Sequence, residues 1–236
     1  MSDTAKLTLP LVQAAQAQKH VTVNESLVRL DGMVQLTLVS VDNSAPPGLP
    51  SDGDCYGIPT GATNEWSGQD GNIALFSNGG WIFIAPNTGW RAWIQDQSAS
   101  AMFSGIEWVP GAVTMSDNGA ALVQKTLEVD HILSAGPTSS AIGALPASAV
   151  VYGITGRVTS AMSGPLTGWR LGVPGTDNRY GSGLGVSAGS WVRGLTSSPQ
   201  TFYTATDLIL TAEGADFVDG QVRLAIHYAE LLLPRI

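Results

Sequence analysis

The chain has 236 residues, of which 44% are hydrophobic and 13% are charged, and it contains 28 Gly and 13 Pro. Average globular proteins carry about 25% charged residues. The high Gly content disfavours a helical bundle, because Gly has a low helix propensity. The net charge of −8 and the pI of about 4.6 lack the basic footprint that nucleic-acid binding requires. We therefore expect a turn-rich, mainly β protein that binds no nucleic acid.

Cysteine usage and hydropathy narrow the class further. The single cysteine, Cys55, excludes an internal disulfide and a Cys-rich zinc site. The N-terminal region has no apolar core of a secretion signal, and no apolar run reaches the roughly 18 residues of a membrane span. We expect a protein that is made in a cytoplasm and is not inserted into a membrane, and a function outside the cell would require release by lysis or on an assembled particle.

The N-terminal region predicts a leader followed by a helix. Residues 1–21, with Pro10 and a Gln/Ala stretch at 13–18, are expected to be extended. Thr22-Val23-Asn24-Glu25 matches a helix capping box, and Leu27, Leu30 and Val34 continue the apolar spacing of a helix over about 23–36. This helix either covers the sheet of its own domain or forms a threefold axis with copies of itself.

Residues 22–109 are predicted to form one domain, the helix plus a small antiparallel β-meander. Ser77-Asn78-Gly79-Gly80 separates two apolar runs, and Asn-Gly favours a tight hairpin turn because both central residues need positive φ. Five tryptophans are expected to build the core of this thin domain, since a small sheet needs bulky side chains for stability. They are Trp66, Trp81, Trp90, Trp93 and Trp108.

Residues 110–120 are predicted to be a linker, because they combine Pro110 and Gly111 with Asp117-Asn118-Gly119 and little periodicity. Residues 121–236 are predicted to form a β-sandwich of jelly-roll type, since turn clusters recur at a spacing of about ten residues. The clearest strand is 222–228, where apolar residues alternate with Arg223, Ala225 and His227.

No catalytic constellation is recognisable. The three histidines, His20, His131 and His227, occur in no nucleophile-elbow or zinc-protease motif. Asp216 and Asp219, and likewise Asp52 and Asp54, are explained by glycine-containing turns. We expect no enzyme activity, no catalytic residues, no metal and no cofactor.

The segment from Trp169 to Arg193 is the candidate ligand-binding face. Sugars are bound by aromatic rings that stack on C–H surfaces and by planar polar groups that bond hydroxyls, and loops on a rigid sandwich commonly carry such groups. The alternative is structural: the two tryptophans belong to the core and the arginines at 170 and 179 form ion pairs. The candidate carbohydrate-binding residues are Trp169, Arg170, Asp177, Asn178, Arg179, Tyr180, Trp191 and Arg193.

Several segments resemble a family of domains of unknown function that occurs in tail-fibre-like genes of alphaproteobacterial prophages and gene transfer agents. They are Gln16–Glu25 (QAQKHVTVNE), Leu30-Asp31, Val34-Gln35-Leu36 and Gly89–Trp93 (GWRAW). This resemblance covers about residues 9–109. The second half looks like the C-terminal part of such proteins through Trp169–Val173, Gly189–Gly194 and Val222–Tyr228.

The resemblance implies a component of a phage-like particle whose first domain lies toward the virion and whose distal domain meets the host. Such fibres are commonly homotrimers. The hypothesis is a tail-fibre or receptor-binding protein that recognises a bacterial surface polysaccharide, capsule or lipopolysaccharide, and contacts other tail or baseplate proteins. The alternatives are a structural tail or baseplate connector without its own receptor site, and a polysaccharide depolymerase.

Overall fold

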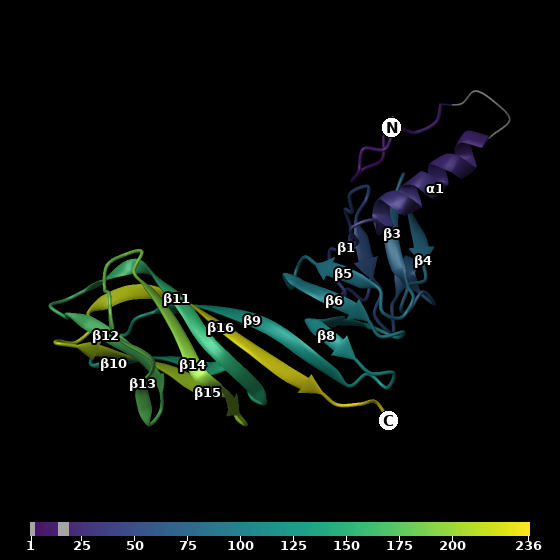
Figure 1. Ribbon diagram of the computed structural model, residues 1–236. Helices are drawn as coiled ribbons and strands as arrows, with labels where there is room; N and C mark the ends of the chain where they lie inside the picture. The colour runs from purple at the N-terminus through teal and green to yellow at the C-terminus, as the bar shows by residue number, and fades with distance from the viewer. Residues whose placement is uncertain (1–2, 14–18) are drawn as a thin grey trace. The chain divides into compact units, whose positions relative to one another are not determined.

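The computed structural model describes residues 3–13 and 19–236 (Figure 1). The chain divides into two compact units, Met1–Ala121 together with Leu233–Ile236, and Leu122–Leu232. Both units are mainly β, as the sequence predicts, and α1 is the one α-helix among the described residues. Part of the predicted leader, including 14–18 of the Gln/Ala stretch, lies outside them. No helix in the described part of the chain has the length and apolar character needed to cross a bilayer.

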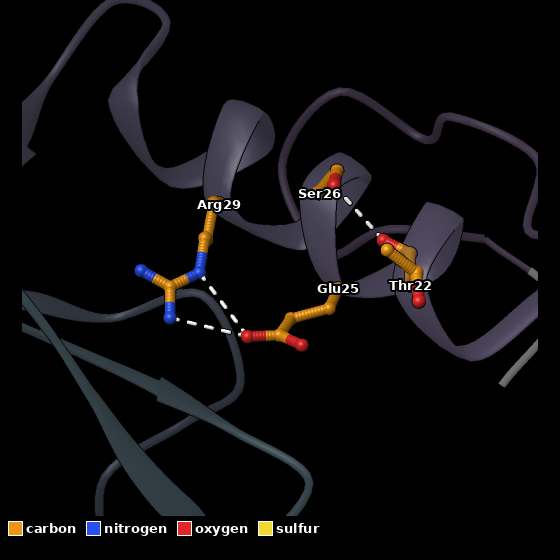
Figure 2. Close-up of polar contacts among 4 residues, drawn as sticks. All are labelled: Thr22, Glu25, Ser26 and Arg29. Atoms are coloured by element: carbon orange, nitrogen blue, oxygen red, sulfur yellow. Dashed lines mark hydrogen bonds and ion pairs between the residues drawn. The ribbon is translucent and has the colours of Figure 1, made fainter.

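Helix α1 (Lys19–Met33) begins earlier than the sequence predicts. Thr22 and Glu25 therefore lie inside the helix, and the predicted capping box is wrong. The Ser26 hydroxyl donates to the Thr22 carbonyl (2.8 Å), and Glu25 forms an i,i+4 ion pair with Arg29 (3.1 Å; Figure 2). Side chains four residues apart lie on the same side of a helix, so these polar groups bond along the helix instead of capping its start.

The C-terminal end of α1 packs against strand β3 (Ile73–Ser77) of the first unit. A Cβ at Gly32 would lie 2.8 Å from the Leu75 side chain, so the absence of a side chain permits the close approach of helix and sheet. Val28 and Met33 pack against the same core. The apolar series predicted as the buried face behaves differently, because Val23 and Leu30 are exposed (42% and 50%).

The first unit also contains two small sheets. β1 (Thr37–Leu38), β5 (Arg91–Ile94), β6 (Ala99–Phe103) and β7 (Trp108–Pro110) form one, and β2 (Cys55–Gly57), β3 (Ile73–Ser77) and β4 (Gly80–Ile84) form the other. β1 is parallel to β5, whereas the hydrogen-bonded pairs β2–β3, β3–β4, β5–β6 and β6–β7 are antiparallel. The predicted hairpin is confirmed, since Asn78 and Gly79 have φ of 50° and 77° between β3 and β4.

Four of the five tryptophans of this unit contribute to its core, as predicted. Trp66, in the 3-10 helix η1 (Asn64–Trp66), is fully buried and lies 5.2 Å from Trp81 between ring centroids. Trp108 is buried beside Phe103, and Trp90 packs at the edge of the same cluster. Trp93 is the exception, with 46% of its surface exposed.

The described part of the leader is tied to α1 through a buried carboxylate. Asp31 accepts hydrogen bonds from the Thr4 hydroxyl (2.7 Å) and from the backbone N–H groups of Lys6 (2.9 Å) and Leu7 (2.6 Å). Burial raises the pKa of Asp31, but these hydrogen bonds outweigh burial and leave the pKa below its ordinary value. The leader thus belongs to the first unit.

The segment 110–120 contains regular structure where the sequence predicts a linker. Strand β8 (Ala112–Met115) lies within it, Ala112 is buried, and the Gly111 N–H donates to the Ser100 carbonyl (2.6 Å). The Asp117-Asn118-Gly119 turn follows, and the division between the two units falls immediately beyond it. The turn residues of this segment lie next to the division between the two units, although the segment itself is hydrogen-bonded to the first unit.

The second unit is built from two sheets. In one, β14 (Trp191–Phe202), β11 (Ala149–Ser163), β16 (Asp219–Leu232) and β9 (Ala121–Ile132) follow one another. The other has the order β10 (Thr138–Leu145), β15 (Thr206–Glu213), β12 (Gly168–Val173) and β13 (Thr176–Leu184). Both sheets contribute to one buried cluster, for example Ile154 and Leu224 from the first and Leu171 and Leu210 from the second. The unit is thus a sandwich of two sheets.

Alternation along each strand determines which side chains face this core and which face outward. In β16, Val222, Leu224 and Ile226 are fully buried, whereas Arg223 is exposed. Successive side chains of a strand point to opposite faces, so the polar residues of β11, β14 and β16 share the outer face of their sheet. That face carries the candidate site.

Candidate functional site

An open groove of about 470 Å³ lies on the outer face of the sheet β14–β11–β16–β9. Sites for small ligands commonly measure about 300–1,000 Å³. We call it the Trp191 groove. It is lined by Glu128 (β9), Thr155, Gly156, Arg157 and Thr159 (β11), Trp191, Val192 and Arg193 (β14), and Arg223 and Ala225 (β16).

Strand register brings these residues together. Arg157 is paired with Trp191 on one side and with Arg223 on the other. Two residues earlier in β11, Thr155 is paired with Arg193 and Ala225. Directly paired residues have Cβ atoms about 4.5–5.5 Å apart, so two adjacent rows of side chains, from three strands, form the floor of the groove.

The aromatic side of the groove is formed by Trp191, which is 62% exposed. The Arg193 guanidinium lies over its ring, with Cζ 5.8 Å from the centroid. A cation at this distance is attracted to the electron-rich face of an indole. The pair therefore places a flat apolar surface and a group of hydrogen-bond donors next to each other.

The two remaining arginines differ in their partners. Arg223 forms a bidentate pair with Asp130, with both contacts at 2.7 Å. The hydrogen bond from Arg223 lowers the pKa of the Asp130 carboxyl, and the same contact raises the pKa of Arg223. Arg157 donates from Nη1 to the Gly189 carbonyl (3.0 Å). Within the described residues, neither Arg157 nor Arg193 has a carboxylate at ion-pair distance.

Hydrogen bonds through His227 connect three strands beside the groove. His227 shares one hydrogen bond with the Thr155 hydroxyl through Nε2 (2.9 Å) and another with the Thr126 hydroxyl through Nδ1 (3.3 Å). This links β9, β16 and β11 beside the groove. The contact orients Thr155, whose side chain is part of the groove floor.

Of the eight predicted carbohydrate-binding residues, Trp191 and Arg193 line the groove. Trp169 and Tyr180 cannot present a ring to a ligand, because they are buried in the core with 1% and 3% of their surfaces exposed. Trp169 also donates from Nε1 to the Gly185 carbonyl (3.0 Å), which holds the loop after β13. The alternative prediction, that both tryptophans belong to the core, is therefore correct for Trp169 and wrong for Trp191.

The other four predicted residues lie on β12 and β13. Arg170 is 3.1 Å from Asp177 and 3.5 Å from Glu213 at ion-pair contacts. Arg179 donates to the Gln200 side chain (2.6 Å), and Asn178 is exposed. These residues belong to the other sheet, so the predicted set does not form one site.

Arg157, Thr155 and Glu128 are groove residues that were not predicted, and Arg223 was predicted only as a polar residue of an alternating strand. Alternation in β16 and in β11 already marks the arginines as outward-facing. Their convergence with Trp191 depends on the register of three strands, which alternation does not reveal.

The described residues hold no cluster of three His, Cys, Asp or Glu side chains that could bind a metal ion. Cys55 is buried in the first unit, and burial raises the pKa of its thiol. The groove itself supplies cationic donors, one carboxylate from Glu128, hydroxyls and an indole face. This set can bind and orient a polar ring-shaped ligand.

Comparisons with known proteins give one family match. Residues 23–109 match the family model described as "Protein of unknown function (DUF2793)", a range that starts after most of the Gln16–Glu25 string. No curated protein matches the chain. Four chains of solved structures show likeness, and the likeness is weak for the two that follow. The "Cyanophage Pam1 capsid asymmetric unit" is 21% identical, with 50% of this chain and 91% of that chain covered and a TM-score of 0.32.

A second structure, "Bacillus endospore appendages form a novel family of disulfide-linked pili", is 17% identical, with 50% of this chain and 97% of that chain covered and a TM-score of 0.21. Likeness at these scores does not define a common fold. The family match covers most of the first unit and leaves the Trp191 groove outside it. Residues 23–109 are therefore similar to a family of domains whose function is unknown.

Proposed function

We propose that this protein is a receptor-binding component of a phage-like particle, a tail-fibre protein that attaches the particle to a bacterial surface polysaccharide through the Trp191 groove. The observation that carries the proposal is the exposed Trp191 ring beside Arg193 on the face of a sheet. The resemblance of the first half to tail-fibre-like proteins supports the particle context. In this account the protein is not an enzyme and uses no cofactor.

The groove suits a saccharide for a physical reason. The C–H face of a pyranose is apolar and stacks on an aromatic ring, while its hydroxyls need planar donors and acceptors at the ring edge. The groove offers the indole, guanidinium groups and the Glu128 carboxylate within one open surface. An open groove also admits an internal segment of a polymer, which an enclosed cavity would not.

We further propose that the protein acts as a homotrimer with α1 near the threefold axis. Val23, Leu27, Leu30 and Val34 follow the 4-3-4 spacing typical of helices that pack against copies of themselves. Val23, Leu30 and Val34 are exposed, so this stripe is available to a second copy. Three copies would present three grooves to one surface, and multivalency strengthens weak individual contacts.

A structural tail or baseplate connector is the second candidate. It is favoured by large apolar side chains on the surface of the second unit, including Ile132, Ile142 and Leu195, each more than 70% exposed. Apolar side chains mark a surface that binds other proteins when they gather into one exposed patch, whereas single ones are common on any surface. In this account the second unit contacts tail partners, and the full chain binds no polysaccharide.

The experiment that separates the two is binding of the full-length protein to immobilised capsular polysaccharides and lipopolysaccharides. The receptor account predicts saturable binding to at least one polymer that soluble polymer competes away. The polymers should keep their length on incubation, because a depolymerase would shorten them. Absence of binding to every polymer, with a folded and oligomeric protein, would favour the connector.

A further inference from the structure

Half of the positively charged side chains of the second unit lie at the Trp191 groove. Residues 122–232 contain six Lys and Arg side chains and eight Asp and Glu side chains. Three of the six cationic side chains, Arg157, Arg193 and Arg223, line the one groove. A unit that is acidic as a whole has thus gathered half of its cations around a single exposed tryptophan.

The arrangement leaves two guanidinium groups of the groove without a carboxylate partner among the described residues. Arg157 and Arg223 are directly paired across β11 and β16, and like charges at paired positions destabilise a sheet. Asp130 neutralises Arg223 through its bidentate contact. Among the described residues Arg157 and Arg193 have no such partner. Local conflicts of this kind are expected where a site serves a ligand.

The charges are also ordered across the groove. Glu128 and Asp130 are on β9, whereas Arg157 and Arg193 are on β11 and β14, next to Trp191. A negatively charged group therefore finds its partners at the β11–β14 side, where the ring of the same sugar can stack on the indole. Glu128, at the other side, is available to accept hydrogen bonds from hydroxyls.

We infer that the groove binds an anionic sugar residue, with the oxyanion between Arg157 and Arg193 and the pyranose on Trp191. This inference rests on the proposed function and names the chemistry of the receptor. The oxyanion is a uronate carboxylate or a sugar-linked phosphate, since guanidinium groups form paired hydrogen bonds to both.

The test uses the full-length protein and a panel of bacterial polysaccharides: neutral polymers, uronate-containing polymers, the same uronate polymers after carboxyl reduction to neutral hexose, and phosphate-containing polymers. Binding is expected to be confined to the anionic polymers and to weaken with rising salt. Carboxyl reduction is expected to weaken binding of a uronate polymer roughly tenfold or more. Binding that survives reduction of a phosphate-free polymer would overturn the inference and leave the proposed function standing.

Variants locate the site. Arg157→Gln and Arg193→Gln are expected to lose binding to the anionic polymers, whereas Arg170→Gln, which removes the same charge from the other sheet, is expected to keep it. Anionic binding that is unchanged in both groove variants would overturn the inference. The uronate and phosphate arms identify which oxyanion is bound. Equal binding to neutral polymers would also overturn it, and failure to bind any polymer would overturn the proposed function as well.

Discussion

The Arg193 guanidinium lies over the Trp191 indole, 5.8 Å from the ring centroid. The two residues are separated by Val192, which is buried in the core of the sandwich. Anchoring of Val192 fixes the strand, so its two outward neighbours keep their spacing on the surface. The strand thus positions an aromatic and a cationic group together without a loop, which limits the conformational entropy lost on binding.

Trp191→Ala should weaken binding of the full-length protein to its polysaccharide by tenfold or more, about 1.4 kcal/mol. The indole is the one aromatic ring among the described residues that line the groove, and substitution of an exposed side chain usually changes stability little. Biolayer interferometry on immobilised polymer measures the loss. Trp93→Ala, which removes another half-exposed tryptophan from the first unit, should bind normally. Equal loss in both variants would contradict a site at Trp191.

Asp130→Asn should strengthen binding to anionic polymers several-fold, because it removes a negative charge beside the groove. The substitution removes the carboxylate that neutralises Arg223 and leaves Glu128 as the one carboxylate among the groove residues, with three guanidinium groups. Titrations at two salt concentrations should show that the gain shrinks as salt rises. A gain that is independent of salt, or weaker binding, would contradict an electrostatic role for the groove.

Leu30→Asp should dissociate the proposed trimer, because a charge on an apolar contact stripe would be buried without a partner. Sedimentation velocity should report a shift from trimer to monomer with unchanged circular dichroism. Ser26→Asp, on the same helix outside the stripe, should remain trimeric. A wild-type protein that sediments as a monomer would reject the trimer, and an oligomeric Leu30→Asp would reject α1 as its axis.

Asp31→Asn should release the leader from α1. An amide oxygen cannot replace the two carboxylate oxygens that accept from Thr4, Lys6 and Leu7, and a lost buried hydrogen bond costs about 1–3 kcal/mol. Hydrogen exchange at the Lys6 and Leu7 amides measures this local opening. Asp52→Asn, in an exposed turn with Asn78, should leave that exchange unchanged.

The same carboxylate predicts a pH dependence. The pKa of Asp31 is lower in the folded protein than its ordinary value of 3.8, so its contribution is fully present above that value. It is lost as the pH falls through the lower, folded-state pKa. The difference in amide protection between wild type and Asp31→Asn should therefore disappear in strong acid. A difference that persists there would contradict a role for the ionised carboxylate.

Local sequence patterns predicted the elements that depend on neighbouring residues. The turn at Asn78-Gly79 and the strand Val222–Tyr228 follow from positive φ and from alternation, and both occur. The capping box at Thr22 failed because α1 starts earlier at Lys19, a boundary that the pattern did not mark. Boundaries also depend on contacts that a local pattern does not contain, such as the hydrogen bonds between Val12 and Asn24 in the first half of α1.

The candidate site was only partly predictable for a different reason. Trp169 and Trp191 have similar sequence surroundings, yet Trp169 faces the core from β12 and is buried, whereas Trp191 faces outward from β14 and is exposed. Arg157 and Arg223 are far apart in the chain and meet only through the pairing of β11 with β16. The sequence showed which residue types suit a sugar, but only the pairing of the strands shows which of these residues lie together.

The most direct test of the account is an array of bacterial surface polysaccharides probed with full-length wild-type protein and with Trp191→Ala and Arg193→Gln at matched oligomeric state. The account predicts that wild type binds at least one anionic polymer and that both variants lose that signal while they stay folded. A folded, oligomeric wild-type protein that binds no polymer, or variants that bind as well as wild type, would contradict the claim that the Trp191 groove is a receptor site.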